Sequence, residues 1–279
     1  MKNYYRLISK IDIKNEKLVK GINLEGLRNL GDPLYFSKKY YAHEIDELII
    51  HDITASLYKN IFIKKLLEKI SKKIFIPITA GGGVRSLDDI EDLLSSGADR
   101  VLISTALFEN INLLEDAVKI YGKANIVINI EYSKIDGQNY VFCKQGREKT
   151  NYLLNDWIKK LKKFEAGEII LTSIDKDGTG KGFDLEVLEE IIKNYSNPVS
   201  IHGGCGSVRD IKNLIDNFPE ISGIVLSSIL HYKYVDKKTE FFKKINLEKF
   251  DIKKLKKKIN SKVRYLRWAK RFILLISPF

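Results

Sequence analysis

A glycine-rich motif occurs twice in this chain, with an offset near 121 residues between the two copies. Residues 77–86 read PITAGGGVRS, and residues 198–207 read PVSIHGGCGS. Glu47 matches Glu168 at the same offset. The identical pairs in the two motifs and the stretches that follow are Pro77/Pro198, Gly82/Gly203, Gly83/Gly204, Ser86/Ser207, Asp89/Asp210, Ile90/Ile211 and Leu93/Leu214. Several matches at one offset indicate that the chain folds as two similar halves.

Short runs rich in β-forming residues alternate with longer stretches in which apolar residues recur three and four positions apart. The expected strands are Leu7–Ile13, Glu47–Ile53, Ile76–Ala80, Arg100–Ser104, Ile126–Ile130, Glu168–Ile174, Val199–Ile201 and Gly223–Leu226. This alternation predicts an α/β fold, a single (β/α)8 barrel of the TIM type built from two half-barrels. In such a barrel, the chemistry lies on the loops that follow the carboxyl ends of the strands.

The charge of the chain is unevenly distributed. The 279 residues include 5 prolines and no Gly/Ser-rich linker, so we expect one barrel domain over residues 1–242. Residues 243–279 carry most of the net charge of +12 and are predicted to form a basic helical C-terminal extension. The basic character therefore belongs to the extension, and it gives no reason to expect nucleic acid as a ligand of the barrel.

Cysteine usage and hydropathy predict a cytoplasmic protein. Cys143 and Cys205 are too few for a disulfide framework, which fits a reducing compartment. The N-terminal residues are interrupted by charges and lack the apolar run of a signal peptide. No stretch of the sequence approaches the roughly 20 apolar residues that cross a bilayer.

The extension has an amphipathic pattern. Its apolar residues Ile252, Leu255, Ile259, Val263 and Leu266 recur at spacings of three and four, with lysines on the other positions. This pattern predicts a helix whose apolar stripe packs on the barrel while its lysines stay in solvent. The alternative is contact between the apolar end of the chain and an anionic membrane surface.

Each glycine motif lies between an expected strand and an expected helix. Glycine lets backbone N–H groups approach an anion, and the helix N-terminus adds a positive dipole end. A pair of hydroxyl residues ends the next strand in each half. The candidate phosphate-binding residues are Gly82, Gly83, Ser104 and Thr105 in one half and Gly203, Gly204, Ser227 and Ser228 in the other. Two such sites predict a substrate with a phosphate at each end, whereas the alternative is that the glycines only make tight turns.

Carboxylates lie at the carboxyl ends of several expected strands. Asp12 ends the first strand and Glu131 the fifth, so the two are expected to face each other across the barrel mouth. Carboxylates in this arrangement can act as general acid and general base. Asp177 follows the sixth strand and is a third candidate at the same rim. The alternative is that one or more of these residues only caps a loop.

Four charged residues lie at strand starts, and hence at the opposite end of the barrel. They are Arg6, Glu47, Arg100 and Glu168. Charges that point into a barrel are costly unless they are paired, so we predict a ring of salt bridges. This ring is either a stabilising polar plug or a gate to the lumen.

Six segments together resemble the cyclase subunits of imidazole glycerol phosphate synthase. The segments read KIDIKNEKLVKGINLEGLRNLGDP, DELIIHDITAS, FIPITAGGGVRS, GADRVLISTA, EAGEIILTSIDKDGTGKGFD and HGGCGS. They lie within roughly residues 1–232, and their order and spacing are highly specific to this family.

The resemblance implies a lyase of histidine biosynthesis that uses no metal or cofactor. It implies a bisphosphorylated ribulosylformimino aminoimidazole carboxamide ribotide as substrate, with imidazole glycerol phosphate and aminoimidazole carboxamide ribotide as products. A glutaminase partner would form a heterodimer with the chain and send ammonia through the barrel from its N-terminal end. By position, Asp12 is one catalytic acid/base, and Lys20 is a further catalytic candidate in the mobile loop after the first strand. The four ring charges match the family's gate, and Asp99 matches a partner-docking position.

Three positions depart from the family's pattern. Glu131 replaces an aspartate, His202 a serine and Ser104 an asparagine. The extra methylene of Glu131 moves its carboxylate by about 1 Å, and such a displacement can reduce the rate on the order of a hundredfold. Such departures also occur in relatives thought to pass ammonia to an amidating enzyme of surface-sugar synthesis, which is the alternative function.

Two further alternatives are disfavoured by the sequence. The segment VKGINLEGLRNLGDP resembles the loop of the cyclase and differs from that of the sister isomerase of the same pathway. A non-catalytic scaffold has no use for phosphate sites, yet the chain keeps Asp12, Lys20 and both glycine loops.

Overall fold

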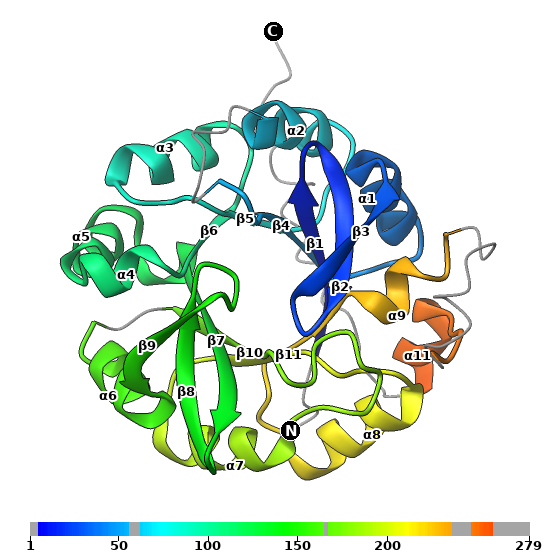
Figure 1. The fold of residues 1–279 in the computed structure, drawn as a ribbon. Helices are drawn as coiled ribbons and strands as arrows, with labels where there is room; N and C mark the ends of the chain where they lie inside the picture. Colours follow the sequence, from blue (N-terminus) through cyan, green and yellow to red (C-terminus); the bar gives the residue numbers. More distant parts are fainter. Residues whose placement is uncertain (1–4, 56–61, 165–166, 236–246, 259–279) are drawn as a thin grey trace, which may run out of the picture.

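A closed parallel barrel forms the body of the protein. The computed structural model describes residues 5–55, 62–164, 167–235 and 247–258 (Figure 1). The barrel strands are β1 (Arg6–Lys14), β4 (Glu47–Asp52), β5 (Ile78–Gly81), β6 (Arg100–Ile103), β7 (Ile126–Ile135), β10 (Glu168–Ser173), β11 (Val199–His202) and β12 (Gly223–Leu226). Each pairs in parallel with the next in chain order, and β12 pairs with β1 to close the sheet. The predicted (β/α)8 barrel is therefore confirmed.

Helices surround the barrel on its outside (Figure 1). They are α1 (Pro33–Ala42), α2 (Phe62–Ser71), α3 (Leu87–Ser95), α4 (Ala106–Glu109), α5 (Asn112–Tyr121), the short 3-10 helix η1 (Lys123–Asn125), α6 (Leu154–Lys162), α7 (Leu185–Asn194), α8 (Val208–Asn217) and α9 (Ser228–His231). Their apolar faces pack against the outward side chains of the strands in one continuous core. Burial of this core is the main stabilising contribution to the fold.

Two hairpins project from the barrel mouth and were not predicted. After β1 the chain forms β2 (Lys17–Ile22) and β3 (Glu25–Gly31), and after β7 it forms β8 (Gln138–Cys143) and β9 (Glu148–Leu153). The tight turn after β7 uses Asp136 and Gly137, which both have positive φ, and Asp-Gly is a strong hairpin signal. Because β1 and β7 start the two halves of the barrel, the hairpins repeat the internal symmetry.

The helices after the two glycine motifs start in the same way. Ser86 caps α3 in a capping box with Asp89, and Ser207 caps α8 with Asp210. Each reciprocal pair satisfies backbone N–H groups that the first helical turn leaves free. The matched residues of the sequence repeat therefore perform the same structural task twice.

An apolar ring fills the middle of the barrel lumen. It consists of Ile8, Ile49, Leu102, Val127, Ile170 and Val225, all at most 2% exposed. Side chains alternate between the two faces of a strand, so residues two positions along each strand also point into the lumen. The ring thus separates the charged strand starts from the polar strand ends.

Part of the basic extension packs on the barrel. In α11 (Ile252–Lys258), Ile252 and Leu255 are buried, as the amphipathic pattern predicts. Lys256 corrects the expectation that the lysines stay in solvent, because it is buried and donates to the Asp46 carboxylate at 2.6 Å. The predicted boundary at residue 242 and the apolar positions Ile259, Val263 and Leu266 lie outside the described residues. Within the described ranges, no helix is long and apolar enough to cross a membrane.

Candidate active site

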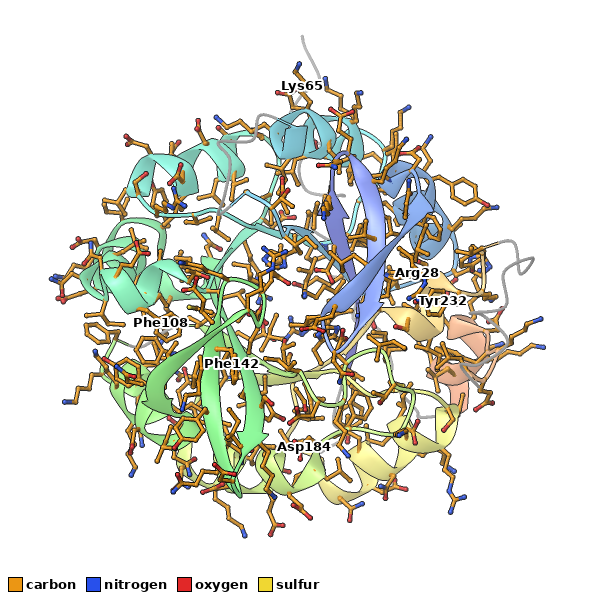
Figure 2. The ribbon with its side chains drawn as sticks, viewed as in Figure 1. Arg28, Lys65, Phe108, Phe142, Asp184 and Tyr232 are labelled. Carbon is orange, nitrogen blue, oxygen red and sulfur yellow. The ribbon has the colours of Figure 1, made fainter. Side chains whose placement is uncertain are left out.

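Two buried carboxylates occupy the barrel mouth. Asp12 on β1 and Glu131 on β7 are 5% and 1% exposed. The Asp12 carboxylate lies 3.0 Å from Lys10 Nζ and 3.3 Å from His51 Nδ1. Glu131 accepts the backbone N–H of Gly146, in the β8–β9 hairpin, at 2.9 Å. Figure 2 shows side chains with nitrogen and oxygen atoms inside the ring of strands.

The surroundings of the two carboxylates shift their pKa values in opposite directions. Burial favours the neutral form of Asp12, but the cationic Lys10 and the contact with His51 outweigh it and hold the pKa well below its usual range. At Glu131 burial dominates and raises the pKa, although Lys10 and His51 partly oppose it. Such a pair provides an ionised base and a carboxyl group that holds its proton to higher pH.

A second ion pair closes over the mouth. Lys20 lies on β2, is 2% exposed and pairs with the carboxylate of Asp177. The pKa of Asp177 is lowered, because its ion pair with Lys20 outweighs the effect of burial. The sequence predicted a mobile loop around Lys20, whereas the structure places this residue on a strand with a buried partner.

The first candidate phosphate site is an open pocket. It is lined by Gly82 and Gly83 after β5, by Ser104 and Thr105 after β6, and by cationic residues that include Lys144. Gly82 has a φ of +110°, and a Cβ there would lie 2.1 Å from the Asp52 carbonyl oxygen. Only glycine fits this turn. Backbone N–H groups, hydroxyls and cations around one hollow are suited to an anion.

The second candidate site is covered in this structure. Gly203 and Gly204 are buried, and the Gly204 carbonyl accepts the backbone N–H of Gly182 at 2.8 Å. His202 Nε2 lies 3.2 Å from the Ser227 hydroxyl, within the predicted site. Burial lowers the pKa of His202 to about 3, so its imidazole is neutral. The two candidate phosphate sites are thus related by sequence, but the first is open to solvent and the second is covered.

The buried hydroxyl of Ser228 in this second site has no hydrogen-bond partner among the described residues. This hydroxyl is therefore free to donate to a ligand.

Four ion pairs at the other end of the barrel form the ring that the sequence predicts, which we call the charged ring. Arg6 Nη1 lies 2.7 Å from Glu47, and Arg6 Nη2 lies 2.6 Å from Glu168. Arg100 contacts the same two carboxylates. The pKa of Glu168 is lowered, because the two guanidinium groups outweigh the effect of burial. Whether the ring acts as a gate stays a prediction.

Asp99 lies beside this ring, directly before β6. Its carboxylate accepts the backbone N–H of Ile78 at 2.8 Å, and the residue is exposed. A strand-start carboxylate in solvent is accessible to a partner on this face. Its predicted docking role is untested.

The sequence reasoning missed three polar residues of the mouth. Lys10 and His51 point into the lumen, and Gln145 of the β8–β9 hairpin lies 3.1 Å from His51 Nδ1. Period-2 alternation could have found Lys10, because it lies two residues before Asp12, and His51, because it lies four residues after Glu47. Gln145 had no such signal. The part of the chain that the structure describes contains no group of three or more side chains suited to a metal ion.

Comparison with known proteins connects this geometry to one family. The family model described as "Histidine biosynthesis protein" matches residues 6–236. The chain is 41% identical over 229 residues to the imidazole glycerol phosphate synthase subunit HisF of Lactococcus lactis subsp. lactis (strain IL1403), covering 81% of this chain and 88% of that protein. It is 44% identical over 206 residues to the subunit of the same name from Legionella pneumophila, covering 74% and 97%. With that of Petrotoga mobilis it shares 37% over 230 residues, covering 81% and 90%.

Proposed function

The chain belongs to the histidine biosynthesis protein family, and on that premise we propose that it is the cyclase subunit of an imidazole glycerol phosphate synthase, a lyase. The observation that carries the proposal is the pair Asp12 and Glu131, buried at the barrel mouth with their pKa values shifted in opposite directions. Cyclisation with ammonia needs a group that accepts a proton and a group that donates one, and such a pair supplies both.

The substrate is a bisphosphorylated ribotide held across the mouth. Its first phosphate binds at Gly82, Gly83, Ser104 and Thr105, where the pocket is open. Its second phosphate binds at Gly203, Gly204, Ser227 and Ser228, after the backbone of Gly182, which covers Gly204 in this structure, moves away. Lys20 and Asp177 pair over the mouth in the structure, and we assign them to closing the site around the substrate.

Ammonia enters from a glutaminase partner that docks on the face of the strand starts. Asp99 lies on this face, and the charged ring separates it from the apolar ring of the lumen. Uncharged ammonia is the form of the nucleophile that an apolar lumen admits, because an ammonium ion there loses its hydration. We place the complex in the cytoplasm, where the free thiols of Cys143 and Cys205 stay reduced.

Complementation tests the proposed function. A strain that lacks the histidine cyclase is given this chain together with ample ammonium, so that the missing glutaminase is not limiting. We expect growth without histidine. Failure by folded, well-expressed protein that binds a matching glutaminase contradicts the proposal.

A second candidate function is ammonia supply to an amidating enzyme of surface-sugar synthesis. The observation that favours it is His202, whose ring contacts the Ser227 hydroxyl inside the second phosphate site. A protein that only delivers ammonia has no need to keep that site open. Purified protein would then turn the bisphosphate over poorly, while the partner's amidation would proceed.

Replacing Arg100 tests the charged ring. We expect Arg100→Ala to keep activity with free ammonium within about twofold of wild type, because Arg100 is remote from the reacting groups. Activity driven by glutamine should change, since the loss of one cation leaves Glu47 and Glu168 partly uncompensated and reshapes the opening. Both activities are measured on the complex, with Arg100→Lys as the matched control. Equal losses in both assays would indicate general destabilisation instead.

Deletion of residues 263–279 tests the extension. We expect turnover to be unchanged, because Ile252 and Leu255, which pack on the barrel, are retained. Co-sedimentation with anionic vesicles is measured for both forms. Sedimentation that is lost on deletion would assign the tail to a membrane surface, and no sedimentation of either form would eliminate that role.

A further inference from the structure

Lys10 places a buried ammonium group in the barrel lumen. It lies on β1, is 0% exposed, and is two residues from both Ile8 and Asp12. Ile8 belongs to the apolar ring, so the alternation of the strand directs Lys10 into the lumen between that ring and the mouth. A lone ammonium in such a place is costly, because its hydration is lost.

The two carboxylates of the mouth, Asp12 and Glu131, differ in their contact with this ammonium. Lys10 Nζ lies 3.0 Å from Asp12 Oδ1, and it has no partner of hydrogen-bond geometry within the described ranges. An ammonium group carries three donors, so donors remain for a molecule bound in the mouth. Among the described residues, the donors to Glu131 are neutral, namely the Asn129 amide at 3.1 Å and the Gly146 N–H.

Other titratable groups surround the same space, and they do not remove this asymmetry. Asp177 and His202 face the pair from the loop after β10 and from β11, while His231 faces it from α9. Burial keeps His202 and His231 neutral, with pKa values lowered to about 3. Besides Lys10, the pKa of Asp12 is also lowered by His51 of β4, which lies 3.3 Å away, and by Lys20 of β2. Lys20 itself is already paired with Asp177. Of the lysine and arginine side chains that the structure describes, Lys10 is the one in direct contact with Asp12.

Building on the proposed function, we propose that Lys10 is a positioning residue that makes Asp12 the proton acceptor and Glu131 the proton donor of the ammonia-dependent reaction. As the ammonia nitrogen bonds to a substrate carbonyl carbon, the Asp12 carboxylate takes one proton from that nitrogen. The Glu131 carboxyl gives one proton to the carbonyl oxygen, so the product of this first transfer is a carbinolamine. The two groups then exchange protons, and a second transfer of the same kind removes another proton from the nitrogen and delivers one to the hydroxyl, which leaves as water while a C=N bond forms. Two protons are removed from the nitrogen and two are delivered to the oxygen, so the balance is kept.

The ionisation of Asp12 is the direct readout. The side-chain carboxyl carbon of Asp12 is followed by carbon-13 NMR against pH, and Asp12→Asn identifies its resonance. In wild type we expect Asp12 to stay ionised at pH values at which Glu131 has taken up its proton. In Lys10→Met, which is similar in size but uncharged, the titration of Asp12 should move up by about one pH unit or more. Lys10→Arg should restore the wild-type position.

Turnover provides the second readout. With free ammonium, the acidic limb of kcat/KM should move to higher pH in Lys10→Met by the same amount as the NMR titration. The acidic limb moves to higher pH because Asp12 must be ionised to accept a proton, and without Lys10 it ionises only at higher pH. Lys17→Met removes an exposed lysine of β2 and should leave both readouts unchanged.

Two results overturn the inference. One is an Asp12 titration at the same pH in wild type and Lys10→Met. The other is a wild-type protein in which Glu131 ionises at lower pH than Asp12, and this result needs no folded variant. If wild type shows no turnover but Lys10→Met still shifts the titration of Asp12, the proposed function is wrong. The control of the Asp12 ionisation by Lys10 is then still supported.

Discussion

Asp12→Asn is expected to reduce ammonia-dependent turnover by about 10² to 10⁴-fold, the range that one general acid or base contributes. Asparagine keeps the size of the side chain but cannot accept the proton. It also leaves the ammonium of Lys10, 3.0 Å away, without its anionic partner. The measurement is turnover of the bisphosphate by purified protein with ammonium salt.

Substrate binding and folding should survive this change. The phosphate sites lie on the loops after β5, β6, β11 and β12, whereas Asp12 lies on β1. We therefore expect nearly unchanged bisphosphate affinity and a folded protein, whose melting temperature is lowered because the buried Lys10 ammonium has lost its partner. Asp136→Asn, at the exposed turn of the β7–β8 hairpin, is the matched control. Wild-type turnover in Asp12→Asn would exclude the catalytic assignment.

Glu131→Gln is expected to remove nearly all turnover of the bisphosphate. Glutamine fits the space between Asn129 and Gly146, which both contact Glu131, but it has no proton to give at this position. The expected loss is again on the order of 10²-fold or more. Glu186→Gln, a largely exposed glutamate of α7, is the control that should behave as wild type.

The same variant distinguishes the two candidate functions. If the chain only delivers ammonia, wild-type turnover of the bisphosphate is poor from the start, and Glu131→Gln leaves the partner's amidation unchanged. Glu131→Asp adds a geometric test, since it withdraws the carboxylate by about 1 Å and such a shift can change the rate on the order of a hundredfold. An unchanged rate in both variants would remove Glu131 from the mechanism.

Short hydrophobic patterns were sufficient to predict the barrel. The expected strand Gly223–Leu226 has the observed bounds, and Glu47–Ile53 differs from β4 by one residue. A buried parallel strand needs a run of β-branched and aliphatic residues, and this requirement is local, so it is visible in the sequence. The β2–β3 hairpin was missed because β3 is mostly polar and exposed, and such a segment has little apolar pattern.

The sequence by itself determined which residues are brought to each end of the barrel. Because of the direction of the strands, Asp12 and Glu131 lie at one end of the barrel and Arg6 and Glu168 at the other. The internal sequence repeat predicts two glycine loops. These features depend on order along the chain, because parallel strands place all their carboxyl ends at one edge.

Only the tertiary structure decided how the groups at each end are paired and covered. Lys20 contacts Asp177, which is far away along the chain, and His202 contacts Ser227. The glycine loop at Gly203 and Gly204 is buried, whereas the matching loop at Gly82 and Gly83 is partly exposed. Lys10 reads as an ordinary strand lysine until the closed barrel places it beside Asp12. The physical reason is that a pKa depends on burial and on charges within a few ångströms, and both are set by contacts between distant segments.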